Sequence, residues 1–363
     1  MATIKDVALK AEVSVTTVSH VVNDTRHVSA KVRERVELAI RELGYVPNAM
    51  ARSLKSNTTS TLGMLIPNSS NPYFAEIVRI VEDRCFGAGY TLVLCNTDDE
   101  PHRQSVYLQV LAERRIDGLI VVSTGAGDEE SLMKQLRGLR MPTVLVDREI
   151  ADPACDLVET AHMQGGLLAV RHLLSLGHRR IACIGGPQGV SPSEQRIAGW
   201  RMALAESGNS TGAADADALL WRGGFTSQGG YEAMHAILRA GTNDIPSAVF
   251  VCNDLMAIGA LRAAHESGVR VPDELSIVGF DDIELSAYTS PALTTVAQPK
   301  ERIGALAVDM LLERVGGRRR DARKVVLQPE LHVRASTARY SGAPAAAPVS
   351  TPSSADTRKS RTP

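Results

Sequence analysis

The chain has 363 residues with a formal net charge of −1 at pH 7, and 44% of its residues are hydrophobic. A chain of this length can bury large cores and predicts two or three domains. It has no run of about 18 apolar residues, which excludes a membrane-spanning helix, and its first residues lack a signal-peptide pattern. Its five cysteines have no metal-ligand spacing, so we interpret them as buried or idle thiols in a reducing cytosol and expect no metal or cofactor.

The first 23 residues predict two short helices joined by a tight turn. Apolar residues over Ile4–Ala11 recur at the helical period, a break follows at Glu12–Val13, and Ser14 can cap a second helix over Val15–Asn23. We expect all the valines of this second helix to be buried. Its polar outer face then carries Thr16, Thr17, Ser19, His20 and Asn23. The pattern indicates a helix-turn-helix that reads the DNA major groove; the competing interpretation is a helical bundle without a nucleic-acid role.

A third helix and the charge distribution extend this prediction. Ser29 can cap the third helix, whose apolar residues lie between Val32 and Leu43, and Gly44 and Pro47 end it. Residues 1–60 contain nine Lys or Arg against six Asp or Glu, a net charge of +3, so the remainder of the chain has a net charge of −4. A basic head on an acidic body favours contacts with phosphates.

The segment after Pro47 predicts a helix that forms only on a partner. Residues 48–55 allow about two helical turns, and isolated helices this short are marginal in water. Arg52 and Lys55 are suited to phosphates, and Leu54 is apolar. The polar stretch over residues 56–60 is typical of a linker.

This head resembles the LacI/GalR family of bacterial repressors, in the branch of the purine and ribose repressors. The residues that carry the resemblance are Ala2–Ala8, Val18–Asn23 and Ala51–Lys55, and the resemblance continues to about residue 339. It implies that the helix over Val15–Asn23 enters the major groove. It also implies that the hinge helices of two subunits pair in the minor groove, where Leu54 wedges into a base step. The expected contacts of this homodimer with double-stranded operator DNA are Thr3, Ser14, Thr16, Thr17, His20, Asn23, Arg26, Arg52, Leu54 and Lys55.

From residue 60 to about residue 333, apolar strands alternate with amphipathic helices. The expected strands are Thr61–Ile66, Thr91–Cys95, Gly118–Val122, Thr143–Val146, Ile181–Ile184, Ala248–Cys252 and Ser276–Phe280. The expected helices are Tyr73–Phe86, Arg103–Arg114, Met163–Leu176, Arg196–Ser207, Gln228–Arg239 and Leu255–Glu266. Continuous apolar strands between helices predict an α/β fold with parallel sheets, in two doubly wound lobes. The resemblance implies lobes of the periplasmic-binding-protein type, with chain crossings near residues 161, 291 and 323.

Unusual polar residues follow the predicted strands, for example Asp147–Arg148 after the fourth strand and Asp281–Asp282 after the last. Ligands of open α/β sheets bind at the carboxyl ends of the strands. Carboxylate, guanidinium and amide groups together with aromatic rings suit a polyhydroxylated ligand. Each of these residues alone has an ordinary explanation as a turn former or an ion-pair partner.

The resemblance assigns sugar contacts to ten positions at these strand ends. They are Asn71, Tyr73, Phe74, Asp147, Arg148, Arg196, Phe225, Asn253, Asp281 and Gln298. Tyr73 replaces a phenylalanine of the periplasmic sugar binders, which leaves the exact sugar open. The purine repressors lack an asparagine at the place of Asn71, which favours a sugar, ribose or a related pentose, over a nucleobase.

Other functions have weaker support in the sequence. No phosphate-binding loop, nucleophile elbow or HExxH motif occurs, and we interpret His162, His172, His178, His235 and His265 as surface or capping residues, so we expect no enzyme activity. A periplasmic transport receptor has the same two-lobed core, but it needs no DNA-reading head. Whether the effector weakens or strengthens the binding of operator DNA stays open.

The expected organisation has three parts. A DNA-binding head with a hinge helix covers residues 1–59, and a two-lobed effector-binding and dimerisation core covers residues 60–339. The tail over residues 340–363 is rich in Ala, Pro, Ser and Thr and is expected to be disordered. Because the tail has no leucine heptads, we expect a dimer, acting in the cytoplasm on the nucleoid.

Overall fold

The computed structural model describes residues 2–46, 58–123, 129–148, 155–208, 216–240 and 245–342. Two compact units, Met1–Thr59 and Ser60–Pro363, make up the chain. The expected hinge helix, with Arg52, Leu54 and Lys55, lies outside the described residues, as does most of the expected tail. Among the described residues, none of the helices has both the length and the hydropathy to cross a membrane.

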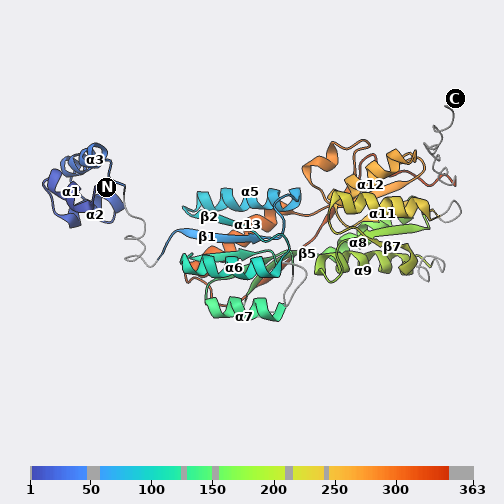
Figure 1. The fold of residues 1–363 in the computed structure, drawn as a ribbon, viewed down its shortest axis with the longest axis horizontal. Coiled ribbons are helices and arrows are strands. Elements are labelled where there is room, and N and C mark those ends of the chain that lie inside the picture. The colour runs from blue at the N-terminus through green and yellow to red at the C-terminus, as the bar shows by residue number, and fades with distance from the viewer. Residues whose placement is uncertain are drawn as a thin grey trace, which may run out of the picture. The chain divides into compact units, whose positions relative to one another are not determined.

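The first unit is a three-helix head formed by α1 (Ile4–Lys10), α2 (Val15–Asn23) and α3 (Ala30–Leu43) (Figure 1). All three predicted helices are confirmed. Val7, Val18 and Val36 are fully buried where the helices meet. Val15 is 42% exposed, so its predicted burial is wrong, because the first turn of α2 extends past this small core. Ser29 occupies the N-cap of α3 without a capping side-chain hydrogen bond.

The second unit contains two α/β lobes, each with a six-stranded sheet. The first lobe, which we call the N-lobe, has a sheet of six strands. They are β1 (Thr61–Ile66), β2 (Thr91–Asn96), β3 (Gly118–Val121), β4 (Thr143–Val146), β5 (Asp156–Thr160) and β11 (Lys324–Leu327). Its strand order is β11-β5-β4-β3-β1-β2, and all pairs are parallel. Its helices are α5 (Pro72–Gly87), α6 (Pro101–Glu113), α7 (Glu129–Leu139) and α13 (Lys300–Val315). α5 lies on one face of the sheet and α6 and α7 lie on the other (Figure 1).

The C-lobe has the strand order β12-β10-β9-β8-β6-β7, and β12 pairs antiparallel to β10 while the other pairs are parallel. Its strands are β6 (Ile181–Gly185), β7 (Leu220–Arg222), β8 (Ala248–Val251), β9 (Ser276–Asp281), β10 (Thr294–Ala297) and β12 (Glu330–His332). Its helices are α8 (His162–Ser175), α9 (Ser191–Glu206), α11 (Ser227–Arg239) and α12 (Asp254–Glu266), with short 3-10 turns η1 (Ala216–Leu219) and η2 (Glu284–Ala287). α8 and α9 cover one face of this sheet, and α11 and α12 cover the other (Figure 1).

The chain passes between the lobes three times, as the resemblance implied, but at partly different places. The first passage joins β5 to α8, close to the expected residue 161. The second joins β10 to α13 near residue 299, and the third joins β11 to β12 near residue 328, so the expected positions 291 and 323 are wrong. The shift arises because β10 and β11 each complete their own sheet before the chain leaves the lobe.

Glycines let the two helices on one face of the C-lobe approach each other closely. A Cβ added at Gly259 in α12 would lie 1.8 Å from the carbonyl oxygen of Ser227. A Cβ added at Gly230 in α11 would lie 2.0 Å from the carbonyl oxygen of Met256. These are backbone atoms, so a side chain at either position forces the helices apart.

We therefore expect Gly259→Ala to lower the free energy of unfolding by about 3 kcal/mol, the upper part of the range for overpacking. Gly138→Ala is the matched control, because Gly138 also lies in a helix but has nothing within 4 Å of an added Cβ. Alanine there should be neutral or stabilising by up to about 1 kcal/mol. Urea unfolding of the full-length proteins measures both changes. Equal stability of the two variants would contradict close packing of α11 on α12.

Candidate functional site

A small pocket lies where strands of both lobes end in the core unit. Its lining residues are Asn71, Tyr73, Phe74, Asp147, Arg148, Pro192, Arg196, Phe225, Asn253 and Asp281. Nine of these are positions that the sequence analysis assigned to the effector, and only Pro192 is new. The tenth predicted residue, Gln298, hydrogen-bonds to two members of this pocket.

Two asparagines tie the pocket to the starts of helices. Asn71 caps α5, where its Oδ1 accepts a hydrogen bond from the backbone N–H of Tyr73 at 3.1 Å. Asn253 caps α12 in the same way, accepting from Met256 N–H at 2.9 Å. In each case the cap satisfies a backbone donor that a helix start otherwise leaves unpaired. The capping role uses the carboxamide oxygen, and the side-chain NH2 of Asn253 donates to the backbone oxygen of Phe225 at 3.5 Å.

Three pocket residues have left-handed backbone conformations. The φ angles are 66° at Asp147, 58° at Phe225 and 111° at Asp281. Such conformations cost about 1–3 kcal/mol each in non-glycine residues and persist where the surrounding structure holds them. Their concentration at one pocket is typical of a functional site.

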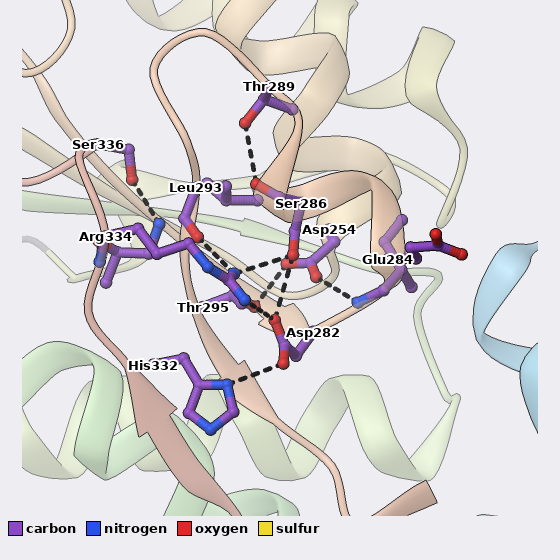
Figure 2. Close-up of polar contacts among 12 residues, drawn as sticks. Asp254, Asp282, Glu284, Ser286, Thr289, Leu293, Thr295, His332, Arg334 and Ser336 are labelled. Carbon is purple, nitrogen blue, oxygen red and sulfur yellow. Dashed lines mark hydrogen bonds and ion pairs between the residues drawn. The ribbon is translucent and has the colours of Figure 1, made fainter.

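A hydrogen-bond network fixes the chain directly after Asp281 (Figure 2). The carboxylate of Asp282 accepts hydrogen bonds from Arg334 at 2.6 Å and from Ser286 at 3.1 Å, and it lies 2.8 Å from Nδ1 of His332. Asp254 accepts from Ile283 N–H at 3.0 Å and from the Thr295 hydroxyl at 2.6 Å. These contacts hold the left-handed segment that directs Asp281 into the pocket.

Within the pocket, an imidazole and a guanidinium group lie between two carboxylates. Nε2 of His162 lies 3.4 Å from Asp147 Oδ1, and its Nδ1 accepts from Nε of Arg196 at 3.4 Å. Nη1 of Arg196 lies 3.4 Å from Asp281 Oδ1 and donates to the backbone oxygen of Cys252 at 2.6 Å. The Arg196 guanidinium also stacks 3.8 Å from the centre of the Phe280 ring. The result is a buried chain of interacting groups, Asp147–His162–Arg196–Asp281, which we call the charge chain.

Tyr73 and Gln298 connect the carboxylates of the two lobes by a second route. The Tyr73 hydroxyl lies 3.0 Å from Asp147 Oδ1 and 3.1 Å from Gln298 Oε1, and its single proton serves one acceptor at a time. The Gln298 amide donates to Asp281 Oδ1 at 2.8 Å. The Tyr73–Gln298 bond joins the two lobes, so a ligand hydroxyl that takes it over affects both of them.

The two pocket aspartates have opposite pKa shifts. Burial alone would raise the pKa of Asp147, but the hydrogen bond and charge of His162 and the two guanidinium groups lower it to about 2. Burial dominates at Asp281 and, despite the lowering effect of Arg196, raises its pKa to about 6. Asp147 is therefore an anion throughout the range from weakly acidic to neutral pH, while Asp281 is mainly ionised at neutral pH and gains its proton near pH 6.

Arg148 is held on the N-lobe side of the pocket. It donates to Asp99 Oδ1 at 2.6 Å and to the backbone oxygen of Ser123 at 2.7 Å, and its guanidinium lies 6.0 Å from the Phe74 ring centre. These contacts fix its position before any ligand arrives.

The open volume of the pocket is only about 20 Å³, room for about one water molecule. A ligand larger than one water molecule therefore fits here only if it displaces side-chain contacts.

His162 corrects one interpretation of the sequence. It is fully buried and central to the charge chain, so its assignment to a surface or capping role is wrong. The sequence analysis did not recognise the strand β5, because this strand contains the polar residues Asp156, Glu159 and Thr160. Had that strand been placed, His162 would have stood at a carboxyl end like the other pocket residues. His178 is also buried, 2.9 Å from the Ser247 hydroxyl, so its surface role is wrong as well.

The polar face of the head is built mainly from α2. Thr16, Asn23 and Arg26 are exposed, and Thr17 and His20 are half-buried. The other predicted positions among the described residues, Thr3 and Ser14, are the N-caps of α1 and α2, and Ser14 accepts a hydrogen bond from the backbone N–H of Thr17 at 3.1 Å. His20 Nδ1 lies 2.8 Å from the Thr25 hydroxyl, which orients its ring.

Both units of the chain match known protein families. Residues 3–48 match the model of bacterial regulatory proteins of the lacI family, and residues 170–337 match a periplasmic binding protein-like domain. The transcriptional repressor PurR of Photobacterium profundum is 41% identical over 93% of this chain and 98% of its own length. The ribose operon repressor of Escherichia coli is also 41% identical, over 93% of this chain and all of its own length. The chain belongs to the LacI family.

Solved structures agree with this assignment. The lac repressor dimer bound to operator and the anti-inducer ONPF is 31% identical, with a TM-score of 0.82 over 93% of this chain and 99% of that one. A LacI family transcriptional regulator from Enterococcus faecium with bound ribose is 30% identical, with a TM-score of 0.68 over 77% of this chain and 99% of that one. The fold is thus a LacI-type helix-turn-helix head followed by two lobes of the periplasmic-binding-protein type.

Proposed function

We propose that this LacI-family protein is a transcriptional repressor whose affinity for operator DNA is switched by a small sugar, ribose or a related pentose. The observation that carries the proposal is the pocket of paired aspartates and arginines contributed by both lobes. The ribose operon repressor and the ribose-bound regulator among its relatives support the choice of sugar.

The proposed sugar contacts follow from the chemistry of the pocket. The carboxylates of Asp147 and Asp281 accept hydrogen bonds from sugar hydroxyls, and the guanidinium groups of Arg148 and Arg196 donate to them. The ring of Phe225 covers an apolar face of the sugar from the C-lobe. Because the contacts come from both lobes, the sugar acts on the angle between them.

A purine is the second candidate, because PurR relatives match the chain as well as the ribose operon repressor does. Isothermal titration of the full-length protein with pentoses, hexoses and purines separates the two. We expect ribose or a close relative to give the tightest binding. If a purine binds tightly and no sugar binds, the proposal of a sugar effector is wrong and a purine corepressor takes its place.

Switching requires a difference in effector affinity between two conformations. Moving a two-state equilibrium from 1:99 to 99:1 takes roughly 5.5 kcal/mol. In our proposal part of this comes from the sugar contacts in each of two subunits, as they replace the Tyr73–Gln298 bond that joins the two lobes. Loss of this bond turns the N-lobes, and the hinge helices expected from the sequence then lose their pairing on DNA.

We further propose a homodimer that reads two half-sites of an operator, because a two-fold DNA site matches a two-fold protein. Large apolar side chains that are exposed on the core unit support a dimer interface there. Phe86 is 78% exposed, and Leu94 on the edge strand β2 is 43% exposed. On the C-lobe, Leu285 is 52% and Tyr288 is 77% exposed. The protein would act where the operator is, in the bacterial cytoplasm.

Base readout by α2 gives a direct test. We expect Thr17→Ala and His20→Ala each to lower operator affinity by about 1–3 kcal/mol while affinity for random DNA stays unchanged. Lys55→Ala should instead weaken binding to all sequences alike and reduce the salt dependence. Gel-shift titrations on operator and random DNA at several salt concentrations measure these effects. Equal losses on both DNAs for the Thr17 and His20 variants would refute our placement of the recognition helix.

A further inference from the structure

A second cavity lies in the N-lobe, at the opposite end of β4 from the effector pocket. Its volume is about 420 Å³, within the range of about 300–1,000 Å³ that is typical of small-molecule sites. Thr143, the first residue of β4, lines this cavity, whereas Asp147, directly after the last residue of β4, lines the effector pocket. The two sites are therefore separate, at the two ends of one buried strand.

Five arginines dominate the lining of this cavity, and no carboxylate is among its described lining residues. The full set is Leu136, Arg137, Arg140, Met141, Pro142, Thr143, Cys155, Arg314, Arg319 and Arg320. A chain with a net charge of −1 thus gathers five positive charges around one hollow. An anion bound among these guanidinium groups would lie in a positive local potential.

One arginine is rigidly held. Arg319 donates to both oxygens of the buried Asp156, at 2.8 Å and 2.5 Å, and to Glu313 at 2.9 Å. Arg319 therefore forms a fixed floor, and the exposed Arg140 and Arg320 stand at the rim of the cavity.

Ordinary structural roles account for part of the cluster only. Arg137 and Arg314 lie in the last turns of α7 and α13, where a positive charge stabilises the helix end. Arg140 and Arg320 lie in loops, so this explanation does not reach them. The cavity also has an apolar wall, formed by Leu136, Met141 and Pro142, which suits the organic part of a ligand.

We propose that this arginine cavity binds a small organic molecule that carries two or more phosphate charges. The planar guanidinium group matches phosphate oxygens in paired hydrogen bonds, which a lysine does not. A nucleoside diphosphate and a sugar bisphosphate share this chemistry. DNA phosphates are disfavoured as the occupant, because the site is a hollow with an apolar wall, whereas the duplex backbone is convex and polar throughout.

The test uses the full-length protein and calorimetric titration at near-physiological salt. The probes are inorganic pyrophosphate, ADP and glucose 1,6-bisphosphate. We expect one site per chain, with at least one organic probe binding more tightly than pyrophosphate. The comparison of ADP with the bisphosphate identifies the source of the phosphate. Arg140→Gln and Arg320→Gln should each weaken binding about tenfold, as expected for the loss of one charge-assisted contact.

Arg318→Gln is the matched control, because Arg318 is exposed on the same loop as Arg320 but does not line the cavity. It should leave probe affinity within about twofold of wild type, since exposed charges interact weakly. Equal weakening by all three substitutions would mean unspecific attraction and would overturn the proposal, as would the absence of binding by any probe at millimolar concentration. If no probe binds but Arg140→Gln and Arg320→Gln weaken binding to operator and random DNA alike, the cluster contacts DNA phosphates instead.

Discussion

Replacing Asp281 by asparagine is expected to abolish the response of this protein to ribose while operator binding persists. Asp281 is 3% exposed and belongs to the C-lobe side of the pocket, where Gln298 donates to it at 2.8 Å. The substitution keeps the size of the side chain but removes the charge that sugar hydroxyls bind. A hydrogen bond to a charged group contributes about 1.5–3 kcal/mol, so we expect ribose affinity to fall about 10- to 100-fold.

A pH series makes this prediction sharper. Burial raises the pKa of Asp281 to about 6, so its carboxylate gains a proton as the pH falls through 6. The protonated group is a poorer acceptor for sugar hydroxyls, and wild-type ribose affinity should therefore fall below pH 6. Asp281→Asn has no proton to gain and should show a flat profile between pH 5 and 8.

The control for Asp281→Asn is Asp273→Asn, which removes an exposed carboxylate of the same lobe. Operator titrations with and without saturating ribose measure the response, and calorimetry measures the affinity. Asp273→Asn should behave as wild type in both. If Asp281→Asn still responded at the wild-type ribose concentration, the assignment of the pocket to the effector would fail.

The parts of the fold that the sequence predicts well are those where one physical signal dominates. β1 and β4 are uninterrupted apolar runs, and their predicted bounds are confirmed to the residue. In the head, the spacing of Val18 and Val21 and the cap at Ser14 suffice for α2, since a small helix needs only one buried stripe and a start signal. Pocket residues such as Asp147 could be placed because they directly follow such strands.

The parts that the sequence did not predict depend on partners distant in the chain. β5 contains Asp156, which is acceptable in a buried strand because Arg319 pairs with it across more than 160 residues and the backbone N–H of Arg323 also donates to it. Without β5, the position of His162 at the pocket was not recognisable. α9 begins at Ser191 rather than at the expected Arg196, because Pro192 opens the helix and brings its first turn into the pocket wall.

Arg196 is the residue whose loss should cost the core unit the most stability. Its side chain is 4% exposed, and it lies between His162 and Asp281 while stacking on Phe280. In Arg196→Met, Asp147 and Asp281 remain buried without this cation. Removing one partner of a buried ion pair destabilises proteins by about 3–5 kcal/mol, and we expect a loss in this range at pH 8.

The pH dependence of that loss follows from the two aspartates. Arg196 lowers the pKa of both, so its removal raises the pKa of Asp281 further above 6. A carboxyl group whose pKa is raised in the folded state favours folding at low pH and loses this contribution as the pH rises through that pKa. The loss of stability in Arg196→Met should therefore be smaller at pH 5, where Asp281 is neutral, than at pH 8.

Arg171→Met provides the matched comparison for Arg196→Met. Arg171 joins α8 to α9 through Glu206 at 2.7 Å, but the two side chains are 50% and 43% exposed. Exposed ion pairs contribute about 0–1 kcal/mol, so this variant should unfold close to wild type at both pH values. Urea unfolding of the three full-length proteins at pH 5 and pH 8 gives the comparison. A similar small loss in both variants at pH 8 would show that the two pocket aspartates do not depend on Arg196, and the charge chain would then have no energetic role in the fold.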